Sequence, residues 1–157
     1  MQPTRPVPAD WPRISSALFY NDAAAAIRWL GQAFGFEVRI IVEHAGHIQH
    51  SELTYGEGVI MVAQADATAV SPQSVQGGNT QSLCVYIDDA VAHCAQARAA
   101  GATILREPTL SDHGPEYWAD LTYQAADLEG HRWWFMQRIR SQPAAVEVKA
   151  PGGAQGA

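Results

Sequence analysis

Two similar stretches decide the fold: NDAAAAIRWLGQAFGF at residues 21–36 and DDAVAHCAQARAAGAT at residues 88–103. Each begins with side chains that accept hydrogen bonds from the first backbone N–H groups of a helix, and each ends near a glycine of the kind that follows one. Both run 13 positions from acid to glycine (35 − 22 and 101 − 88). Apolar residues with helical spacing are Ala23, Ala26, Ile27, Leu30 and Phe34 in the first stretch, and Val91, Cys94 and Ala95 in the second. We therefore predict two helices that bury these faces.

β-like runs surround each of these helices in the same order. One run precedes the helix, a short strand follows it, and two more strands are joined at a Glu-Gly turn. The expected strands are residues 13–20, 37–44, 47–55 and 59–64 in the first half, and 80–87, 102–108, 119–127 and 131–138 in the second. The duplicated order predicts an α+β fold of two βαβββ modules. An ordinary open α/β sheet is the alternative, but it does not require matching caps, stops and turns, and no Gly-rich phosphate loop is present.

The chain divides into a folded unit at residues 13–140 and two tails. The first module spans about 13–64, the linker 65–79 and the second module about 80–140, and the linker is rich in turn-forming residues. Residues 1–12 and 141–157 are rich in Pro, Gly, Ala and Gln without periodicity, so we expect tails of low order. A length of 157 residues suits one domain.

Composition excludes several classes of partner. Ten Lys and Arg against 16 Asp and Glu give a formal net charge of −6, and no basic run could follow a phosphate backbone. We therefore expect neither nucleic acid nor a membrane surface as a partner. The two cysteines have no CxxC spacing, and the sequence lacks an apolar run of about 18 residues. A reducing cytoplasm is the expected location.

Four segments, in order, resemble the vicinal oxygen chelate superfamily, which contains glyoxalases, bleomycin-resistance proteins and extradiol dioxygenases. They are YNDAAAAIRWLGQAFGFEV, SELTYGEGVIMV, YIDDAVAHCAQARAAGATILREP and YQAADLEGHRWWF, and together they cover nearly all of residues 13–140. The last is similar to the closing Y-x-x-x-D-x-E-G-H-x-W-x-F pattern of the family. The resemblance implies two βαβββ modules that form a curled, half-open mixed sheet, commonly completed in a dimer.

Enzymes of this superfamily usually hold a divalent metal with four side chains that point into the cup of the sheet. The resemblance places Ser15, Met61, Ser82 and Trp134 at these positions. None is a usual ligand, because serine hydroxyls bind zinc, nickel or iron poorly, and Met and Trp offer neither carboxylate nor imidazole. The resemblance therefore implies that the usual metal site is missing. We expect no cofactor, and a divalent metal remains only as the alternative.

Strand alternation gives the cup an expected lining of small, aromatic and sulfur-containing side chains with one cation. The expected ligand contacts on strands are Ser15, Phe19, Met61, Ser82, Tyr86, Arg132 and Trp134. Tyr117 and Trp118 lie in a loop beside His113 and are expected to form a lid or a dimer contact. The alternative is that the strand residues fill a closed core.

The densest cluster of ligand-capable side chains is HAGHIQHSE, residues 44–52. Only His50 and Glu52 fall at i and i+2 on one strand face, so they are the candidates for a general base or an unconventional metal pair. A surface hairpin of solvated histidines is the competing interpretation. His131 follows the second Glu-Gly turn, and alternation turns it toward the helices as a packing residue.

These residues favour a metal-free protein that sequesters a small, aromatic or planar metabolite or drug, because such binding requires shape and stacking surface. A glyoxalase-like lyase or isomerase that uses His50 and Glu52, or an atypical metal, is the first alternative. A dimeric scaffold without a ligand is the second. Exposed sheet edges and half-open cups predict a homodimer in each case.

Overall fold

The computed structural model describes residues 3, 5–7, 9 and 11–141. The first module contains β1 (Ser16–Tyr20), α1 (Ala23–Phe34), β2 (Glu37–His44), β3 (His47–Tyr55) and β4 (Gly58–Gln64). A 3-10 turn, η1 (Pro72–Val75), lies in the expected linker. The second module contains β5 (Ser82–Tyr86), α2 (Ala90–Ala99), β6 (Thr103–Asp112), β7 (Ala119–Ala126) and β8 (Arg132–Arg140). The expected C-terminal tail lies outside the described residues from residue 142 onward.

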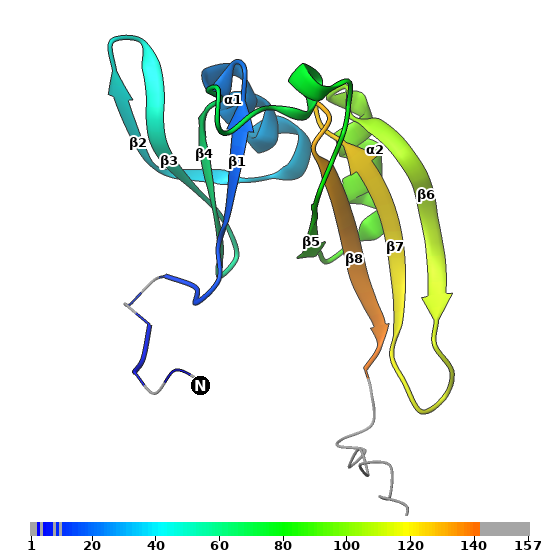
Figure 1. Cartoon of the computed structure of the whole chain (residues 1–157). Coiled ribbons are helices and arrows are strands. Elements are labelled where there is room, and N and C mark those ends of the chain that lie inside the picture. Colours follow the sequence, from blue (N-terminus) through cyan, green and yellow to red (C-terminus); the bar gives the residue numbers. More distant parts are fainter. Residues whose placement is uncertain (1–2, 4, 8, 10, 142–157) are drawn as a thin grey trace, which may run out of the picture.

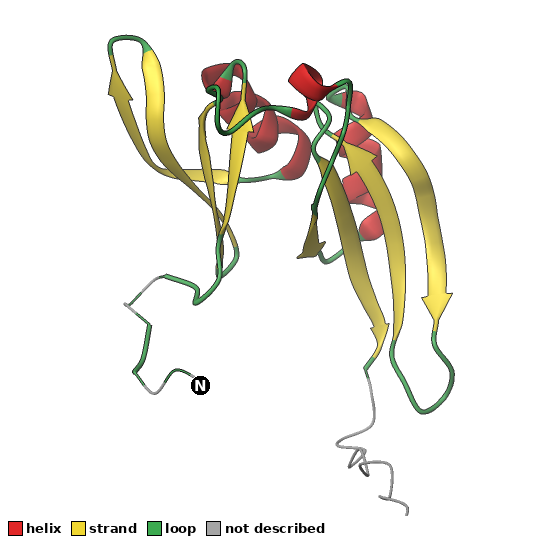
Figure 2. Cartoon of the chain, viewed as in Figure 1, coloured by secondary structure: helices red, strands yellow, loops and turns green. Residues whose placement is uncertain are grey.

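Each module forms one mixed sheet of four strands, and this confirms the duplicated βαβββ order. The strand orders are β1-β4-β3-β2 and β5-β8-β7-β6, with a parallel pair at β1/β4 and at β5/β8 and antiparallel pairs elsewhere. The sheets do not close into a barrel. Figure 1 shows them diverging from a common upper region, where both helices also lie, and Figure 2 shows the long strands of the second sheet extending below it. Within the described part of the chain, no helix is long and apolar enough to cross a membrane.

Helix α1 forms where the sequence pattern places it. The Asp22 carboxylate accepts a hydrogen bond from the backbone N–H of Ala25 at 2.8 Å, and Gly35 ends the helix in the left-handed conformation with φ +77°. All five apolar residues predicted for its buried face are buried: Ala23, Ala26, Ile27, Leu30 and Phe34. The strong apolar stripe therefore sets the rotation of this helix.

Helix α2 forms as expected but buries a different face. Asp89 caps it, and the buried residues are Ala90, Cys94 and Ala97. The predicted face was wrong at two positions, since Val91 is 60% exposed and Ala95 is exposed. Alanine occupies half of this helix, so its apolar stripe is weak and packing against the sheet decides its rotation.

The core lies between the helices and the inner faces of the two sheets. Phe34 packs against both Trp133 and Phe135, with ring centroids 5.3 and 4.7 Å apart, and this links α1 to the second sheet. Residues that alternate toward the helices are buried, as Leu18, Val62 and Trp133 are. No helix of the described residues covers the opposite face of either sheet, and we term this the open face.

A turn at residues 127–131 joins the modules, and we term it the latch. Asp127 accepts hydrogen bonds from the Tyr20 hydroxyl at 2.6 Å and from Trp133 Nε1 at 3.0 Å. Glu129 accepts from the backbone N–H groups of Asn21 and Asp22 at 2.7 and 2.9 Å, at the start of α1. Burial and the adjacent Asp127 carboxylate hold the pKa of the Tyr20 hydroxyl well above its usual value. The latch therefore satisfies two buried carboxylates and fixes the first strand of module one against the second module.

Candidate functional site

The strand residues expected to line the cup lie on the open faces of the two sheets. Ala17 pairs with Met61 across β1 and β4, and Cys84 pairs with Trp134 across β5 and β8, while their immediate neighbours turn toward the helices. The same alternation places Phe19 beside Met61, and Tyr86 and Arg132 beside Trp134. The open faces are therefore uncovered by helices, and these side chains do not fill the core between the helices and the sheets.

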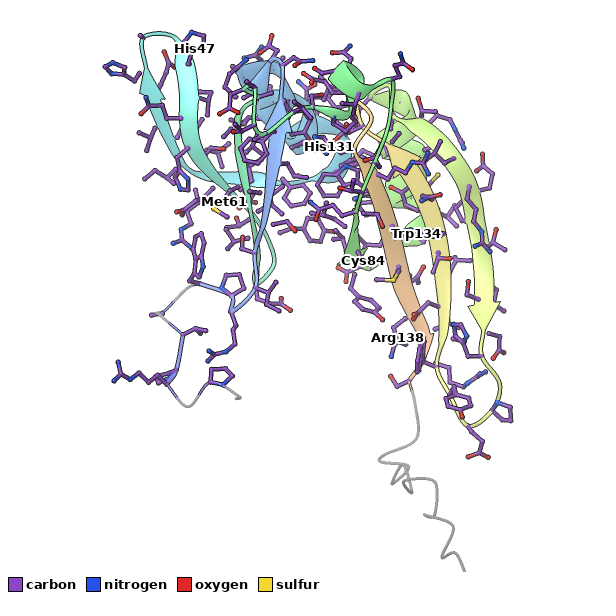
Figure 3. The ribbon with its side chains drawn as sticks, viewed as in Figure 1. His47, Met61, Cys84, His131, Trp134 and Arg138 are labelled. Carbon is purple, nitrogen blue, oxygen red and sulfur yellow. The ribbon has the colours of Figure 1, made fainter. Side chains whose placement is uncertain are left out.

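The four positions that correspond to the usual metal ligands do not meet in one cavity of the single chain. Ser15 and Ser82 line a shared cavity between the modules, whereas Met61 and Trp134 do not border it. Figure 3 shows Met61 on the first sheet and Trp134 on the second, well separated. The two open faces thus do not form one shared site around these four positions in the single chain.

The cavity between the modules has a volume of about 870 Å³ and is bordered by the free edge strands β1 and β5. Its wall includes the half-buried apolar side chains of Leu83 and Val85 and the ring of Tyr55. Glu57 and Asp88 also border it. Burial raises the pKa of the Tyr55 hydroxyl, and the negative charge of Asp88 raises it further. This cavity is large enough for a small organic molecule, but its two carboxylates share one sign of charge.

The open face of the second sheet carries a row of four side chains that cross it from edge to edge. Strand register places Arg106 opposite Gln124, Gln124 opposite Trp134, and Trp134 opposite Cys84. The Arg106 guanidinium lies 5.9 Å from the centroid of the half-buried Trp134 ring. Arg132 lies two residues from Trp134 on the same strand and is exposed on the same face. This face therefore combines a stacking platform with cations.

A second polar group on this face was missed from the sequence. Arg138 Nε donates to the buried carboxylate of Asp120 at 2.6 Å, and its guanidinium also donates to the Tyr86 hydroxyl and lies 5.2 Å from the centre of the Tyr86 ring. Figure 3 shows Arg138 further along β8 from Trp134. Continuing the alternation from Trp134 through Met136 to Arg138 would have found it. Asp120 neutralises Arg138 and fixes the orientation of Tyr86.

On the open face of the first sheet, His50 and Glu52 are in contact as their spacing predicted. His50 Nε2 lies 3.1 Å from Glu52 Oε1, and Arg39 Nε lies 3.0 Å from the other carboxylate oxygen. The His50 side chain is 41% exposed and that of Glu52 is 16% exposed. If Nε2 carries the proton toward Glu52, Nδ1 is the basic nitrogen. The arrangement is a histidine–carboxylate pair in which the carboxylate is also bound to a cation.

The N-terminal segment places the aromatic ring of Trp11 at this first open face. The Arg39 guanidinium lies 5.3 Å from the centre of the Trp11 ring, and Trp11 borders a hollow of about 820 Å³ together with Thr54 and Val59. No periodic pattern marks Trp11 in the sequence, because this residue lies before the first strand in a Pro-rich segment.

The described histidines of residues 44–52 do not gather into one cluster. His44 and His47 pair at its exposed tip, away from His50 (Figure 3 shows His47 there). Among the described residues, no group of three His, Cys, Asp or Glu side chains is close enough to hold a metal ion. Within one chain, His50 and Glu52 thus have no third protein ligand of these types.

Tyr117 and Trp118 lie at the tip of the β6–β7 hairpin rather than at the cavity between the modules. The Trp118 ring packs against His113 at 5.2 Å, and both aromatic residues are partly exposed. Arg140 binds the Asp112 carboxylate and the Gly114 carbonyl, and its hydrogen bond holds the pKa of Asp112 below its usual value. Strand β6 also extends to Asp112, beyond the expected end at residue 108, so the loop is shorter than the sequence suggested.

His131 takes the packing role expected for it. Its Nε2 lies 3.0 Å from the Phe19 carbonyl oxygen, and its ring packs against Tyr20 with centroids 4.6 Å apart. It belongs to the latch.

Comparison with known proteins places the chain in a family. The model of the Glyoxalase/Bleomycin resistance protein/Dioxygenase superfamily matches residues 13–135. TioX from Micromonospora sp. ML1 is 32% identical, with a TM-score of 0.61, and the match covers 82% of this chain and 99% of TioX. No curated protein matches the sequence.

Other solved structures share the fold at lower identity. TnmS3, an antibiotic binding protein from Streptomyces sp. CB03234, is 15% identical, with a TM-score of 0.60 and coverage of 79% of this chain and 93% of TnmS3. The V278E mutant of glyoxalase I from Zea mays is also 15% identical, with a TM-score of 0.61 and coverage of 79% and 43%. The chain belongs to the Glyoxalase/Bleomycin resistance protein/Dioxygenase superfamily.

Proposed function

We propose that this protein binds a small aromatic or planar molecule and sequesters it without chemical change. The observation that carries the proposal is the Trp134 ring, which is only half-buried on a sheet face that no helix covers. Tyr86 on the neighbouring strand is 52% exposed and lies on the same face. Apolar surface of this kind on a folded protein marks a binding site more often than a structural one. TnmS3, which has the same fold, is an antibiotic binding protein.

The binding cup is proposed to be completed in a homodimer. Strands β1 and β5 are free edges of their sheets, and each open face is half of a cup in the single chain. Pairing two chains would cover the edges and bring the open face of one module toward that of a partner's module. Sedimentation at micromolar concentration tests this, and we expect about twice the 17.0 kDa chain mass. A clean 17.0 kDa species contradicts it.

Binding is proposed to need no metal. Ser15, Met61, Ser82 and Trp134 supply hydroxyl, thioether and indole groups where the superfamily's enzymes place metal ligands, and these groups bind divalent metals poorly. The test is elemental analysis of protein purified without chelator. A stoichiometric divalent metal would contradict the proposal.

An enzyme that uses His50 is the second candidate, because His50 and Glu52 are in contact on the other open face. Contact with the carboxylate orients the imidazole, as a general base requires. Against this candidate, Glu52 already pairs with Arg39. A dimer that binds no ligand is the third candidate, and a dimer with no heat of binding in the titrations below would support it.

Two substitutions separate binding from catalysis. If the cup binds a planar ligand by stacking, Trp134→Ala weakens binding by more than the loss of buried area explains. The reason is that an aromatic contact adds about 0.5–1.5 kcal/mol beyond the area buried. His50→Ala then changes affinity little. If His50 is a base, His50→Ala lowers turnover by about 10²-fold or more and leaves affinity nearly unchanged. Calorimetry with a panel of aromatic ligands measures the affinities without relying on tryptophan fluorescence. A larger loss of affinity for His50→Ala than for Trp134→Ala contradicts the stacking site.

A further inference from the structure

The arginines of the second module divide into two groups. Those with a carboxylate partner are Arg98 with Glu107, Arg138 with Asp120, and Arg140 with Asp112. Among the described residues, the guanidinium groups of Arg106 and Arg132 form no ion pair and no hydrogen bond. These two are the arginines beside Trp134. Among the described arginines of the second module, the two without a carboxylate partner thus lie at the stacking platform.

The net charge on the open face of the second sheet is opposite in sign to that of the whole protein. Arg106, Arg132 and Arg138 each contribute a positive charge, and Asp120 removes one, so the face carries a formal charge of +2 (3 − 1). The whole chain carries −6. A local cationic surface on an acidic protein concentrates anions there and disfavours cations.

In the proposed dimer, the carboxylate on strand β3 of the facing sheet is already paired. Glu52 has both carboxylate oxygens engaged, one by Arg39 and the other by His50. Moving Glu52 to Arg106 or Arg132 of a partner would break both contacts. Glu52 therefore leaves the guanidinium groups of Arg106 and Arg132 to a ligand.

We infer that the ligand of this site is a planar anion: a ring system that bears a carboxylate or a similar acidic group. The inference rests on the proposed function and specifies the chemistry of its ligand. The ring stacks on Trp134, and the acidic group pairs with Arg106 or Arg132, whose planar donors match a carboxylate in two-point geometry. Stacking of a ligand ring replaces the contact between Arg106 and Trp134 and frees that guanidinium for the anion. The amide of Gln124, next in the row, offers a further donor.

A matched pair of probes tests the charge requirement: naphthalene-2-carboxylate and the neutral naphthalene-2-carboxamide. Both have the same ring, so the difference in their affinities reports the contribution of the anion. Calorimetry on the full chain at low salt should give the carboxylate about tenfold tighter binding, since a charged hydrogen-bonded pair contributes this order of affinity. Raising the salt concentration to about 0.5 M should weaken binding of the carboxylate and leave binding of the carboxamide nearly unchanged, because screening affects only the charged probe.

Substitution of the two arginines locates the effect. Arg106→Gln with Arg132→Gln should bring the two probes to within about twofold of each other while the affinity for the carboxamide is kept. Arg28→Gln is the matched control, because Arg28 is exposed on α1, far along the chain from the site, and also lacks a carboxylate partner among the described residues. It should leave the ratio unchanged. Far-ultraviolet circular dichroism and melting curves check that the variants fold.

The outcomes distinguish this inference from the proposed function. Equal binding of both probes by the wild type overturns the planar anion and leaves planar-ligand binding in place, provided that Trp134→Ala weakens both. A loss of selectivity in Arg28→Gln equal to that in the double variant also overturns it, because the cause would then be the overall field. If the wild type binds neither probe, both the inference and the planar-ligand proposal are contradicted.

Discussion

The two modules carry the same Glu-Gly turn in sequence, but only one of these turns joins the modules. Glu129 in the second module is buried and accepts hydrogen bonds from the start of α1. Glu57 in the first module is exposed and has no hydrogen bond or ion pair among the described residues. The first turn instead borders the cavity between the modules, which also contains Asp88 at the start of α2.

Loop length accounts for the difference. Tyr55 pairs with Gly58, so the first turn has only residues 56 and 57 between its strands, whereas Ala126 pairs with Arg132 and leaves residues 127–131 between them. The longer turn contains Asp127, whose Oδ1 accepts from three backbone N–H groups within the turn. This folds the turn inward and directs Glu129 toward α1. At α2, Gln137 takes the corresponding role by accepting from the N–H of Ala90 at 3.0 Å.

A short repeated motif therefore does not determine its own contacts. The same two residues form a buried junction where the loop is long enough to reach the neighbouring helix, and a solvent-exposed turn where it is not. The consequence for function is that one side of the module boundary is closed by the latch while the other side stays open as a cavity.

The largest expected effect is that of Asp127→Ala. This substitution removes the acceptor for Tyr20, Trp133 and three turn N–H groups at a buried site, so we expect a loss of about 3–5 kcal/mol in the free energy of unfolding. Urea unfolding followed by circular dichroism measures it. A loss below about 1 kcal/mol would show that water replaces the carboxylate and that the latch does not hold the modules together.

The stability of the two turns is compared directly by two variants, Glu129→Ala and Glu57→Ala. Glu129→Ala leaves the N–H groups of Asn21 and Asp22 and the Ser71 hydroxyl without their acceptor, so we expect a loss of about 1–3 kcal/mol. Glu57→Ala changes an exposed residue and should stay within about 0.5 kcal/mol of the wild type. The same urea titration serves for both. Equal losses would mean that the two turns are equivalent in solution.

Much of the fold could be predicted from the sequence because it depends on patterns that repeat over many residues. The stripe in residues 23–34 fixed both the position and the rotation of α1, and strand alternation placed Met61 and Trp134 on the correct sheet face. The rotation of α2 could not be predicted, since an alanine-rich helix offers little contrast between its faces. The role of Asp127 and Glu129 in joining the modules also could not be predicted, because it depends on which helix lies opposite the turn.

The sheet faces of the candidate-site residues could be predicted from the sequence, but the contacts between them could be predicted only in part. Spacing alone brought His50 and Glu52 together, because residues two apart on a strand share a face. The contact of Glu52 with Arg39 could not be foreseen, as it crosses from β2 near an irregularity in the strand pairing. Trp11 and Asp120 were missed for the same reason: their partners are distant in the sequence, and no period links them.

The smallest expected effect is on the pH dependence of stability, at the second place where the modules meet. His93 on α2 donates from Nε2 to the Phe34 carbonyl oxygen of α1 at 3.1 Å, and its Nδ1 accepts from the Tyr123 hydroxyl at 2.6 Å. This arrangement needs the neutral ring. Burial lowers the pKa of His93 below its usual value, although the hydrogen bond to Phe34 opposes the shift. The histidine junction is therefore sensitive to acid.

The direction of this pH dependence follows from the lowered pKa of His93. Above about pH 6.5 the ring is neutral in both the folded and the unfolded chain, so its contribution is complete. As the pH falls below that value, the unfolded chain takes up a proton that the folded chain resists, and stability is lost. His93→Gln keeps a donor and an acceptor but removes the titration. Urea unfolding at pH 8 and about pH 5.5 should therefore show a smaller loss for His93→Gln than for the wild type. An equal loss in the two proteins would assign the acid sensitivity to other groups and leave His93 as a packing residue.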